Sequence, residues 1–189
     1  MTVTKAIEAA GFGDVLAARR ARDEAALFAA RERLAGADLM ILGALADRVR
    51  TEEVGDDVRI FTGDARTEVG VLVLGREERG LPLLRRVALA RITGPHRARV
   101  RVDWAGAGLE IAQVALGFGA NELEGPIANK RGLPIAEDAV KKVKGQGMVA
   151  VAALKKIELE GLIRRAGRTP IFEAEKGHEA TSLETEARP

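Results

Sequence analysis

Residues 98–125 decide the fold, and they divide into three segments: Ala98-Arg-Val-Arg-Val-Asp-Trp104, Ala105-Gly-Ala-Gly-Leu-Glu-Ile-Ala-Gln-Val-Ala-Leu-Gly-Phe-Gly119 and Ala120-Asn-Glu-Leu-Glu-Gly125. The first segment alternates arginine with valine, a period of two that is typical of a strand. In the middle segment a pair of glycines breaks the strand and opens a helix whose apolar residues recur at helical spacing. Gly119 suits the left-handed backbone position that follows a helix end. The stretch therefore predicts a strand, a buried helix and a second short strand.

Strand and helix patterns also occur on both sides of this unit. Residues 58–62 and the fully apolar residues 69–74 are predicted strands, and 81–92 are a predicted helix. A fully apolar strand suits a parallel sheet that is covered on both faces. Residues 169–172 have the pattern of a short edge strand. The alternation predicts an α/β fold: a partial or shrunken TIM-barrel-like parallel sheet, or an open sheet of four to five mostly parallel strands, with an N-terminal helical pair.

The chain is expected to have three regions. An N-terminal helical segment spans residues 1–53, the α/β partial-barrel domain spans 54–172, and 173–189 form a disordered tail because they are almost devoid of apolar residues. In the first region Gly11-Phe-Gly13 interrupts the helical pattern, and Asp14 and Asp38 are positioned to cap the two helices that follow. In the second region, residues 126–134 are expected to be a loop, followed by a short helix ending at Lys144 and a helix over 148–165.

Composition excludes several classes of function. The 189 residues include no cysteine and two histidines, so thiolate nucleophiles and cysteine-bound zinc or iron–sulfur clusters are excluded, and a histidine metal site is not expected. Thirty basic and 28 acidic residues are interspersed and leave a charge of +2, which is typical of a solvated surface and not of a nucleic-acid-binding face. No apolar run approaches the roughly 20 residues that span a bilayer, and the N-terminus has no signal-peptide core. We therefore expect a cytoplasmic protein with no cofactor and no metal.

Polar groups at the strand ends are the candidates for a site. Asp103 lies where a predicted strand ends, the position at which α/β folds place functional groups. Glu122 and Glu124 are two residues apart on the next strand, so they share a face and one of them could hold a proton. The alternative is that both are exposed residues of the rim. Gly106-Ala-Gly108 resembles the start of a dinucleotide loop, but Ile111 stands where the third glycine is required, and a plain tight turn is the alternative.

The central stretch resembles the C-terminal end of the radical S-adenosylmethionine (SAM) barrels of futalosine-dependent menaquinone biosynthesis. These are aminodeoxyfutalosine synthase, dehypoxanthine futalosine cyclase and the related deazaflavin (FO) synthase subunits, which carry a Trp and then Gly-Leu-x-x-Ala-Gln-x-Ala-Leu-x-Phe-Gly-Ala-Asp-Asp-Leu-x-Gly. Here Trp104 precedes Gly108-Leu-Glu-Ile-Ala-Gln-Val-Ala-Leu-Gly-Phe-Gly-Ala-Asn-Glu-Leu-Glu-Gly125. Residues 37–50 and 159–171 also resemble the helix before the first barrel strand and the closing helix. About half of the chain is covered in matching order.

The departures from this family bear on activity. The enzymes hold a 4Fe–4S cluster on a three-cysteine motif directly after the first strand, whereas here Phe61-Thr-Gly-Asp-Ala-Arg66 follows it. The middle of the barrel is missing, and the Asp-Asp pair of the closing motif is Asn121-Glu122. Without a cluster there is no reductive cleavage of SAM. The resemblance therefore implies ancestry and a partial fold, and it argues against the parent activity.

Two functions from different classes follow. The first is a non-catalytic, cluster-free relative that acts as an accessory or regulatory partner in menaquinone-type biosynthesis. The second is a small nucleoside-binding protein or enzyme that uses the retained barrel rim: Asp103, Trp104, Asn121, Glu122 and Glu124. In that case Trp104 would stack on a base and the acids would accept hydrogen bonds from ribose. A decayed gene product is a third alternative. Because an incomplete barrel exposes strand edges, we also expect a homodimer or a complex with a partner protein.

Overall fold

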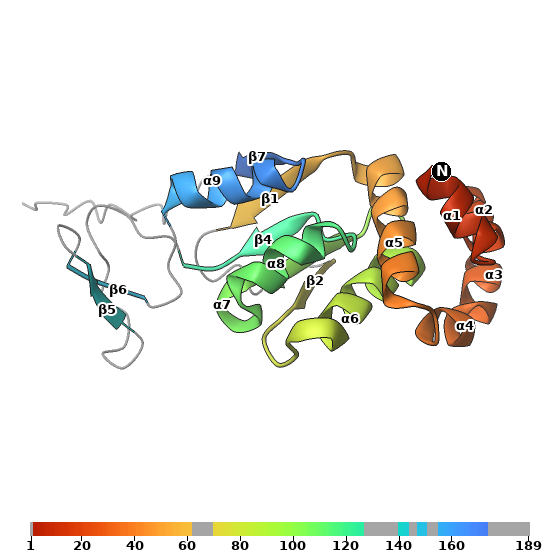
Figure 1. The fold of residues 1–189 in the computed structure, drawn as a ribbon, viewed down its shortest axis with the longest axis horizontal. Coiled ribbons are helices and arrows are strands. Elements are labelled where there is room, and N and C mark those ends of the chain that lie inside the picture. Colours follow the sequence, from red (N-terminus) through yellow and green to blue (C-terminus); the bar gives the residue numbers. More distant parts are fainter. Residues whose placement is uncertain (1, 62–69, 127–139, 144–146, 151–154, 174–189) are drawn as a thin grey trace, which may run out of the picture.

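The computed structural model of the chain describes residues 2–61, 70–126, 140–143, 147–150 and 155–173. Its centre is a five-stranded sheet of β1 (Asp57–Phe61), β2 (Val71–Leu74), β3 (Arg99–Asp103), β4 (Glu122–Glu124) and β7 (Thr169–Phe172). The strand order is β2-β3-β4-β1-β7, and every neighbouring pair is parallel (Figure 1). The expected α/β fold with a parallel sheet is confirmed, and β7 lies at an edge as predicted.

The register divides this sheet into two faces with different chemistry. Side chains alternate along each strand, and residues paired between neighbouring strands point the same way. One face carries the buried apolar side chains of Val58, Ile60, Val100, Val102 and Leu123. The opposite face, called the polar face below, carries Arg59, Phe61, Arg99, Arg101, Glu122 and Glu124. The core therefore lies on one side of the sheet and most of the candidate site on the other.

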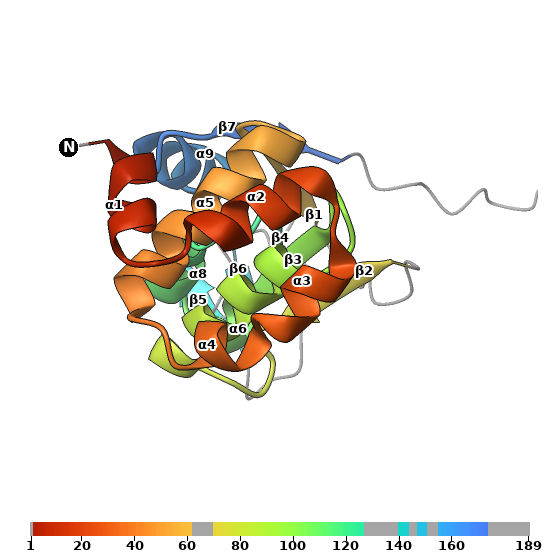
Figure 2. The same cartoon turned by 90° about the vertical axis from the view of Figure 1, so that its right-hand side faces the viewer.

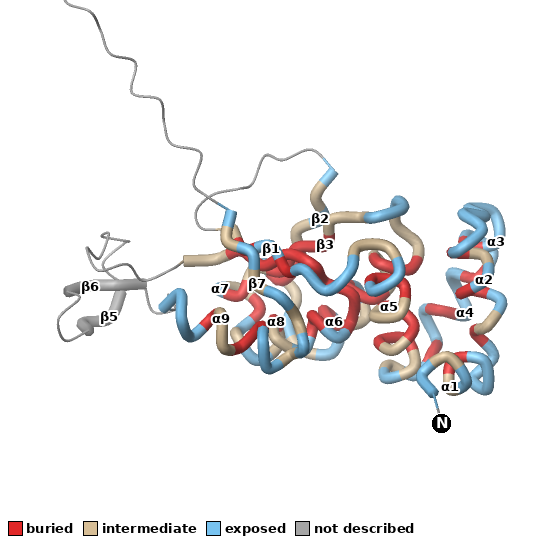
Figure 3. The backbone as a smooth tube through the Cα atoms, turned by 90° about the horizontal axis from the view of Figure 1, so that it is seen from above, coloured by how far each residue is buried: buried red, intermediate tan, exposed pale blue. Residues whose placement is uncertain are grey.

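Helices cover the apolar face. They are α5 (Leu39–Val54), α6 (Gly80–Thr93), α8 (Leu109–Leu116) and α9 (Lys156–Arg165), and α7 (Trp104–Ala107) is a single turn between β3 and α8 (Figure 3). Their buried residues, such as Leu45, Val87 and Leu116, form one core with the strands. In the described part of the chain no helix lies over the polar face, although Arg101 and Glu122 at its centre are buried. Within the same ranges, no helix is long and apolar enough to cross a membrane.

Four short helices precede α5. They are α1 (Val3–Ala9), α2 (Gly13–Ala21), α3 (Glu24–Ala29) and α4 (Arg31–Ala35), and they pack at the end of the molecule where the strands begin (Figures 1 and 2). The predicted cap of α5 is confirmed, because Asp38 Oδ1 accepts the backbone N–H groups of Met40 at 2.9 Å and Ile41 at 3.1 Å.

The single long helix predicted after Asp14 is wrong. Arg22 adopts the left-handed conformation with φ 57° and ends α2, and Asp23 accepts a hydrogen bond from the N–H of Ala26 at 2.9 Å and begins α3. Asp14 lies inside the first turn of α2 and pairs with Arg33 instead of capping the helix. A side-chain cap and one left-handed residue thus override a continuous helical composition.

The segment between β4 and α9 also differs from the prediction. Residues 140–143, predicted as the end of a short helix, form β5 (Val140–Val143), which pairs antiparallel with β6 (Gly147–Ala150). The helix predicted over 148–165 begins only at Lys156. Valines on both sides of Lys-Gly-Gln-Gly favour a hairpin, which explains the error. The predicted loop over 126–134 and the predicted tail over 173–189 lie almost entirely outside the described residues.

Arg19 joins three stretches of the chain at the amino-terminal ends of the strands. Its guanidinium donates to both carboxylate oxygens of Glu53, at 2.5 and 2.9 Å, and to three carbonyl oxygens within residues 92–95. Glu53 also accepts the backbone N–H of Arg97 at 2.8 Å. The side chains of Arg19 and Glu53 are only 6% and 7% exposed. This pair therefore ties α2 to the end of α5 and to the connection before β3.

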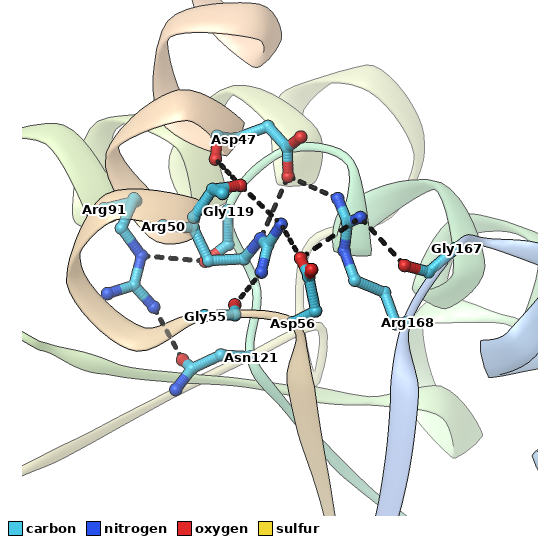
Figure 4. A network of polar contacts seen from close by, with 10 residues as sticks. Asp47, Arg50, Gly55, Asp56, Arg91, Gly119, Asn121, Gly167 and Arg168 are labelled. Atoms are coloured by element: carbon cyan, nitrogen blue, oxygen red, sulfur yellow. Dashed lines mark hydrogen bonds and ion pairs between the residues drawn. The ribbon is translucent and has the colours of Figure 1, made fainter.

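A second arginine network fixes β7 beside β1 (Figure 4). Arg50 is buried on α5 and donates to Asp47 at 2.9 Å, to Asp56 at 3.2 Å and to the carbonyl of Gly55. Arg168, directly before β7, donates to Asp47 at 2.6 Å and lies 3.8 Å from Asp56. The two aspartates connect α5 with the start of β7, which holds the C-terminal strand at the edge of the sheet.

The Arg19–Glu53 pair predicts how stability changes in acid. Burial raises the pKa of Glu53, but hydrogen bonds from Arg19 and from the Arg97 backbone outweigh it and leave the pKa below its ordinary value. A lowered pKa stabilises the fold above the unfolded-state pKa of about 4.3, and this contribution is lost as the pH falls through the folded-state pKa.

We therefore expect Glu53→Gln, which cannot titrate, to be less stable at neutral pH but to lose less stability than the natural protein as the pH falls below about 5. Thermal denaturation at stepped pH values measures this. Glu110→Gln, an exposed change on α8, is the control and should follow the natural protein. A Glu53→Gln curve parallel to that of the natural protein would contradict the assignment.

Candidate functional site

The candidate site occupies the polar face where β1, β3 and β4 lie side by side. The register forms two rows across these strands, Arg59–Glu122–Arg101 and, nearer the carboxyl ends, Phe61–Glu124–Asp103. The carboxyl ends of parallel strands are where such folds bind ligands. Glu122 and Glu124 share a face, as their spacing predicts.

Glu122 is held by two arginines of the neighbouring strand. Arg99 donates to its carboxylate through Nε at 2.5 Å and Nη2 at 3.2 Å. Arg101 donates through Nε at 2.9 Å, and its Nη2 lies 2.7 Å from the same carboxylate. The side chains of Arg101 and Glu122 are 0% and 1% exposed. Glu122 is therefore an internal counter-ion and not an exposed residue of the rim.

Glu124 has its own basic partners. Arg76, from the loop after β2, donates to its carboxylate at 2.9 Å, and Arg101 Nη1 reaches it at 3.4 Å. The ring of Phe61 lies 3.6 Å from Cζ of Arg101, a cation–π distance. Arg101 thus contacts two carboxylates and one aromatic ring, and it is the centre of the polar face.

Asp103 and Trp104 have structural roles at the end of β3. Asp103 Oδ1 accepts the backbone N–H of Ala105 at 2.8 Å and caps α7. Trp104 is 2% exposed, and a Cβ on Gly125 would overlap its indole ring. The indole therefore packs on the backbone after β4 and is not presented for stacking on a base.

The Gly106-Ala-Gly108 turn is tightly packed. A Cβ on Gly106 would overlap the carbonyl of Gly75, so the turns after β2 and β3 are in backbone contact. Gly108 has φ 87° and immediately precedes α8. This packing supports the tight turn over the dinucleotide loop.

Asn121 is separated from the other candidates because it faces the helices. Its Oδ1 accepts Arg91 Nη2 at 2.6 Å and the N–H of Val100 at 2.9 Å (Figure 4). Arg91 also donates to the carbonyl of Gly119 at 2.8 Å, and a Cβ on Gly119, at φ 100°, would approach the Arg91 side chain to 2.8 Å. Burial lowers the pKa of Arg91 to about 10. Asn121 therefore orients a buried arginine of the core.

These contacts limit the chemistry of the site. The three candidate acids already accept hydrogen bonds, Glu122 and Glu124 from arginines and Asp103 from a helix terminus. A general base must instead lie within reach of a substrate proton. Among the described side chains, no three His, Asp or Glu residues gather as a metal site. The arrangement is suited to binding through charge, since the side chains of Arg59 and Arg76 are about half exposed.

The prediction did not include the arginine partners of the two glutamates, although the sequence indicated them. Arg99 and Arg101 alternate with valine, so they share a face of β3, and the same period places Glu122 and Glu124 on one face of β4. Opposite charges with matching periods on neighbouring strands indicate cross-strand ion pairs. Arg76 and Phe61 had no such signal, because their positions depend on the pairing of β1, β4 and the loop after β2.

No protein-family model matches the chain, and no curated protein is significantly similar to it. The functional argument therefore depends on the residues and contacts described above.

The ion pairs predict unequal effects for the two glutamates. Glu122→Gln leaves Arg101 buried without its principal counter-ion, and we expect it to lower the free energy of unfolding by about 3 kcal/mol. Glu124→Gln should cost less, about 1 kcal/mol, because its partner Arg76 is 43% exposed. Urea denaturation followed by Trp104 fluorescence measures both, with Glu110→Gln as control. Equal values for Glu122→Gln and Glu110→Gln would contradict the structural role of Glu122.

Proposed function

We propose that this protein is a non-catalytic, cluster-free relative of the futalosine-pathway radical SAM enzymes, acting as an accessory or regulatory partner in menaquinone-type biosynthesis. The observation that carries the proposal is the engagement of the candidate acids. Residues 108–125 resemble the closing motif of those enzymes, yet Glu122, Glu124 and Asp103 serve as counter-ions and as a helix cap. Acids that are engaged in this way support a binding role over a catalytic one.

The strand order supports a shortened barrel as the origin of the sheet. In a closed barrel of eight strands the first strand lies beside the last. Here β1 pairs with β4, the strand of the closing motif, and β7 occupies its other side. A barrel that had lost its middle strands would keep the first pairing, and a later segment would fill the vacated place.

The exposed edge of the polar face is the surface that we assign to the partner. Arg101 and Glu122 at the centre of this face are buried, whereas Arg59 and Arg76 are about half exposed. In the described ranges the helices cover only the opposite face. A radical enzyme of the same pathway is the partner that the ancestry favours.

The position of the acids favours a second candidate, a nucleoside-binding protein. Asp103 and Glu124 are register partners at the carboxyl ends of β3 and β4, where acids can accept hydrogen bonds from ribose hydroxyls. The burial of Trp104 and the inward position of Asn121 count against the full set of five residues acting together.

The absence of a cluster is tested directly. We expect the protein, reconstituted anaerobically with iron and sulfide, to stay colourless, because the sulfur it contains is that of three methionines, which are poor substitutes for thiolates. Iron and sulfide analysis and visible absorption measure this, and a cysteine-bearing enzyme of the pathway is the positive control. Stoichiometric iron and sulfide would overturn the non-catalytic proposal.

Partner binding is tested with purified aminodeoxyfutalosine synthase and dehypoxanthine futalosine cyclase. We expect one of them to bind in sedimentation experiments, and Arg59→Glu to weaken binding about tenfold by reversing a charge on the polar face. Arg86→Glu is the matched control, since Arg59 and Arg86 are both paired with glutamate and their side chains are 53% and 54% exposed. No binding to either enzyme, together with a saturable change of Trp104 fluorescence on titration with adenosine, aminodeoxyfutalosine-type nucleosides or SAM, would favour the second candidate.

A further inference from the structure

A pocket of about 380 Å³ lies among the N-terminal helices, away from the polar face. Its walls come from the end of α2, from α3, from the start of α4 and from residues 93–96 before β3. This volume is in the range of pockets that bind small molecules. None of the residues of the polar face lines it, so its function is independent of the one proposed above.

The pocket carries more positive than negative charge. Arg19 at its base is neutralised by Glu53. Arg22 and Arg31 also line it, and neither forms an ion pair with a carboxylate of the described residues. Glu24 is the single acid of the lining. Two exposed guanidinium groups in one concave site are suited to a carboxylate or phosphate, which they can bind through paired hydrogen bonds.

Arg22 is held in place by backbone and side chain. Its φ of 57° is uncommon for a residue other than glycine. Its Nη2 lies 3.2 Å from Nε2 of His96, whose Nδ1 lies 3.4 Å from Glu53. The contact with Glu53 orients the imidazole, and the imidazole orients Arg22 at the edge of the pocket. The left-handed conformation is that of the residue that ends α2, and the contacts through His96 fix the direction of the Arg22 side chain.

An aromatic ring forms the apolar side of the pocket. Phe28 is 68% exposed although it is a large apolar residue. The guanidinium of Arg31 lies 5.0 Å from its ring centroid. Leu27 and Pro95 continue the apolar lining. An exposed phenyl ring in a concave, basic site indicates a ligand with a flat apolar body.

We propose that this pocket binds an aromatic acid, a planar apolar molecule bearing a carboxylate or phosphate group. Arg22 and Arg31 hold the anionic group, His96 positions Arg22, and Phe28 stacks on the planar body.

Calorimetric titration of the full chain tests the proposal with phenyl phosphate and benzoate. We expect saturable binding of at least one, and the tighter of the two identifies the anionic group. Inorganic phosphate should bind about tenfold more weakly because it does not contact Phe28, and benzyl alcohol should not bind because it has no charge. The proposal is overturned if neither phenyl phosphate nor benzoate shows saturable binding at concentrations up to about 10 mM. A Kd above this concentration corresponds to a binding free energy of less than about 3 kcal/mol. Equal binding of benzyl alcohol would also overturn the proposal.

Arg22→Gly is the decisive variant, because glycine accepts the left-handed backbone and removes the side chain without strain. It should unfold at the same or a higher temperature and bind the aromatic acid about tenfold more weakly. Arg97→Gly is the matched control: Arg97 has φ 56° and does not line this pocket, so binding should be unchanged.

Phe28→Ala should weaken binding of the aromatic acid and leave that of inorganic phosphate unchanged. Unaltered affinity in Arg22→Gly would refute the assignment.

Discussion

The buried ion pair between Arg101 and Glu122 is the interaction on which the polar face depends. It joins β3 to β4 with almost no solvent contact. Such a pair contributes little net stability, but removal of either partner leaves an uncompensated charge and is strongly unfavourable. The charges of the face must therefore remain matched, and Arg99, Arg76 and Glu124 extend the same balance toward solvent. Because of this constraint, Glu122 and Glu124 have basic partners within the protein itself.

Local patterns predicted several elements correctly. Asp38 caps α5 through contacts within three residues, which is a local signal. The patterns of residues 99–103 and 169–172 predicted the strands β3 and β7, but they did not predict the distant strands with which these pair. The helical pattern after Asp14 failed because the breaks at Arg22 and Asp23 depend on one backbone conformation and one cap, which composition does not reveal. The edge position of β7 was predicted, but the Arg168 contacts that hold it there involve residues far apart in sequence.

The candidate site was predictable in position and not in chemistry. The spacing of Glu122 and Glu124 placed both on one face, and the end of β3 placed Asp103 beside them. Their partners come from other segments: Arg101 from β3, Arg76 from the loop after β2 and the ring of Phe61 from β1. Only strand order brings these together. Asn121 and Glu122 are adjacent in the sequence but lie on opposite faces of the sheet, because side chains alternate along an extended backbone.

Asn121 shows how one neutral side chain affects the balance of charge in the core. Arg91 is completely buried, and its Nη1 has no hydrogen-bond partner among the described residues. The asparagine supplies an acceptor at 2.6 Å but no negative charge. Burial outweighs the attraction of Glu53 and Glu122 and lowers the pKa of Arg91. An aspartate at this position would neutralise Arg91, but it would also bury a second charge. Asparagine also fits the second bond at this site, because the same Oδ1 accepts the N–H of Val100 and so fixes the start of β4 against β3. Asn121 thus holds the strand register through its bond to Val100 and accepts a hydrogen bond from Arg91 without adding a second buried charge.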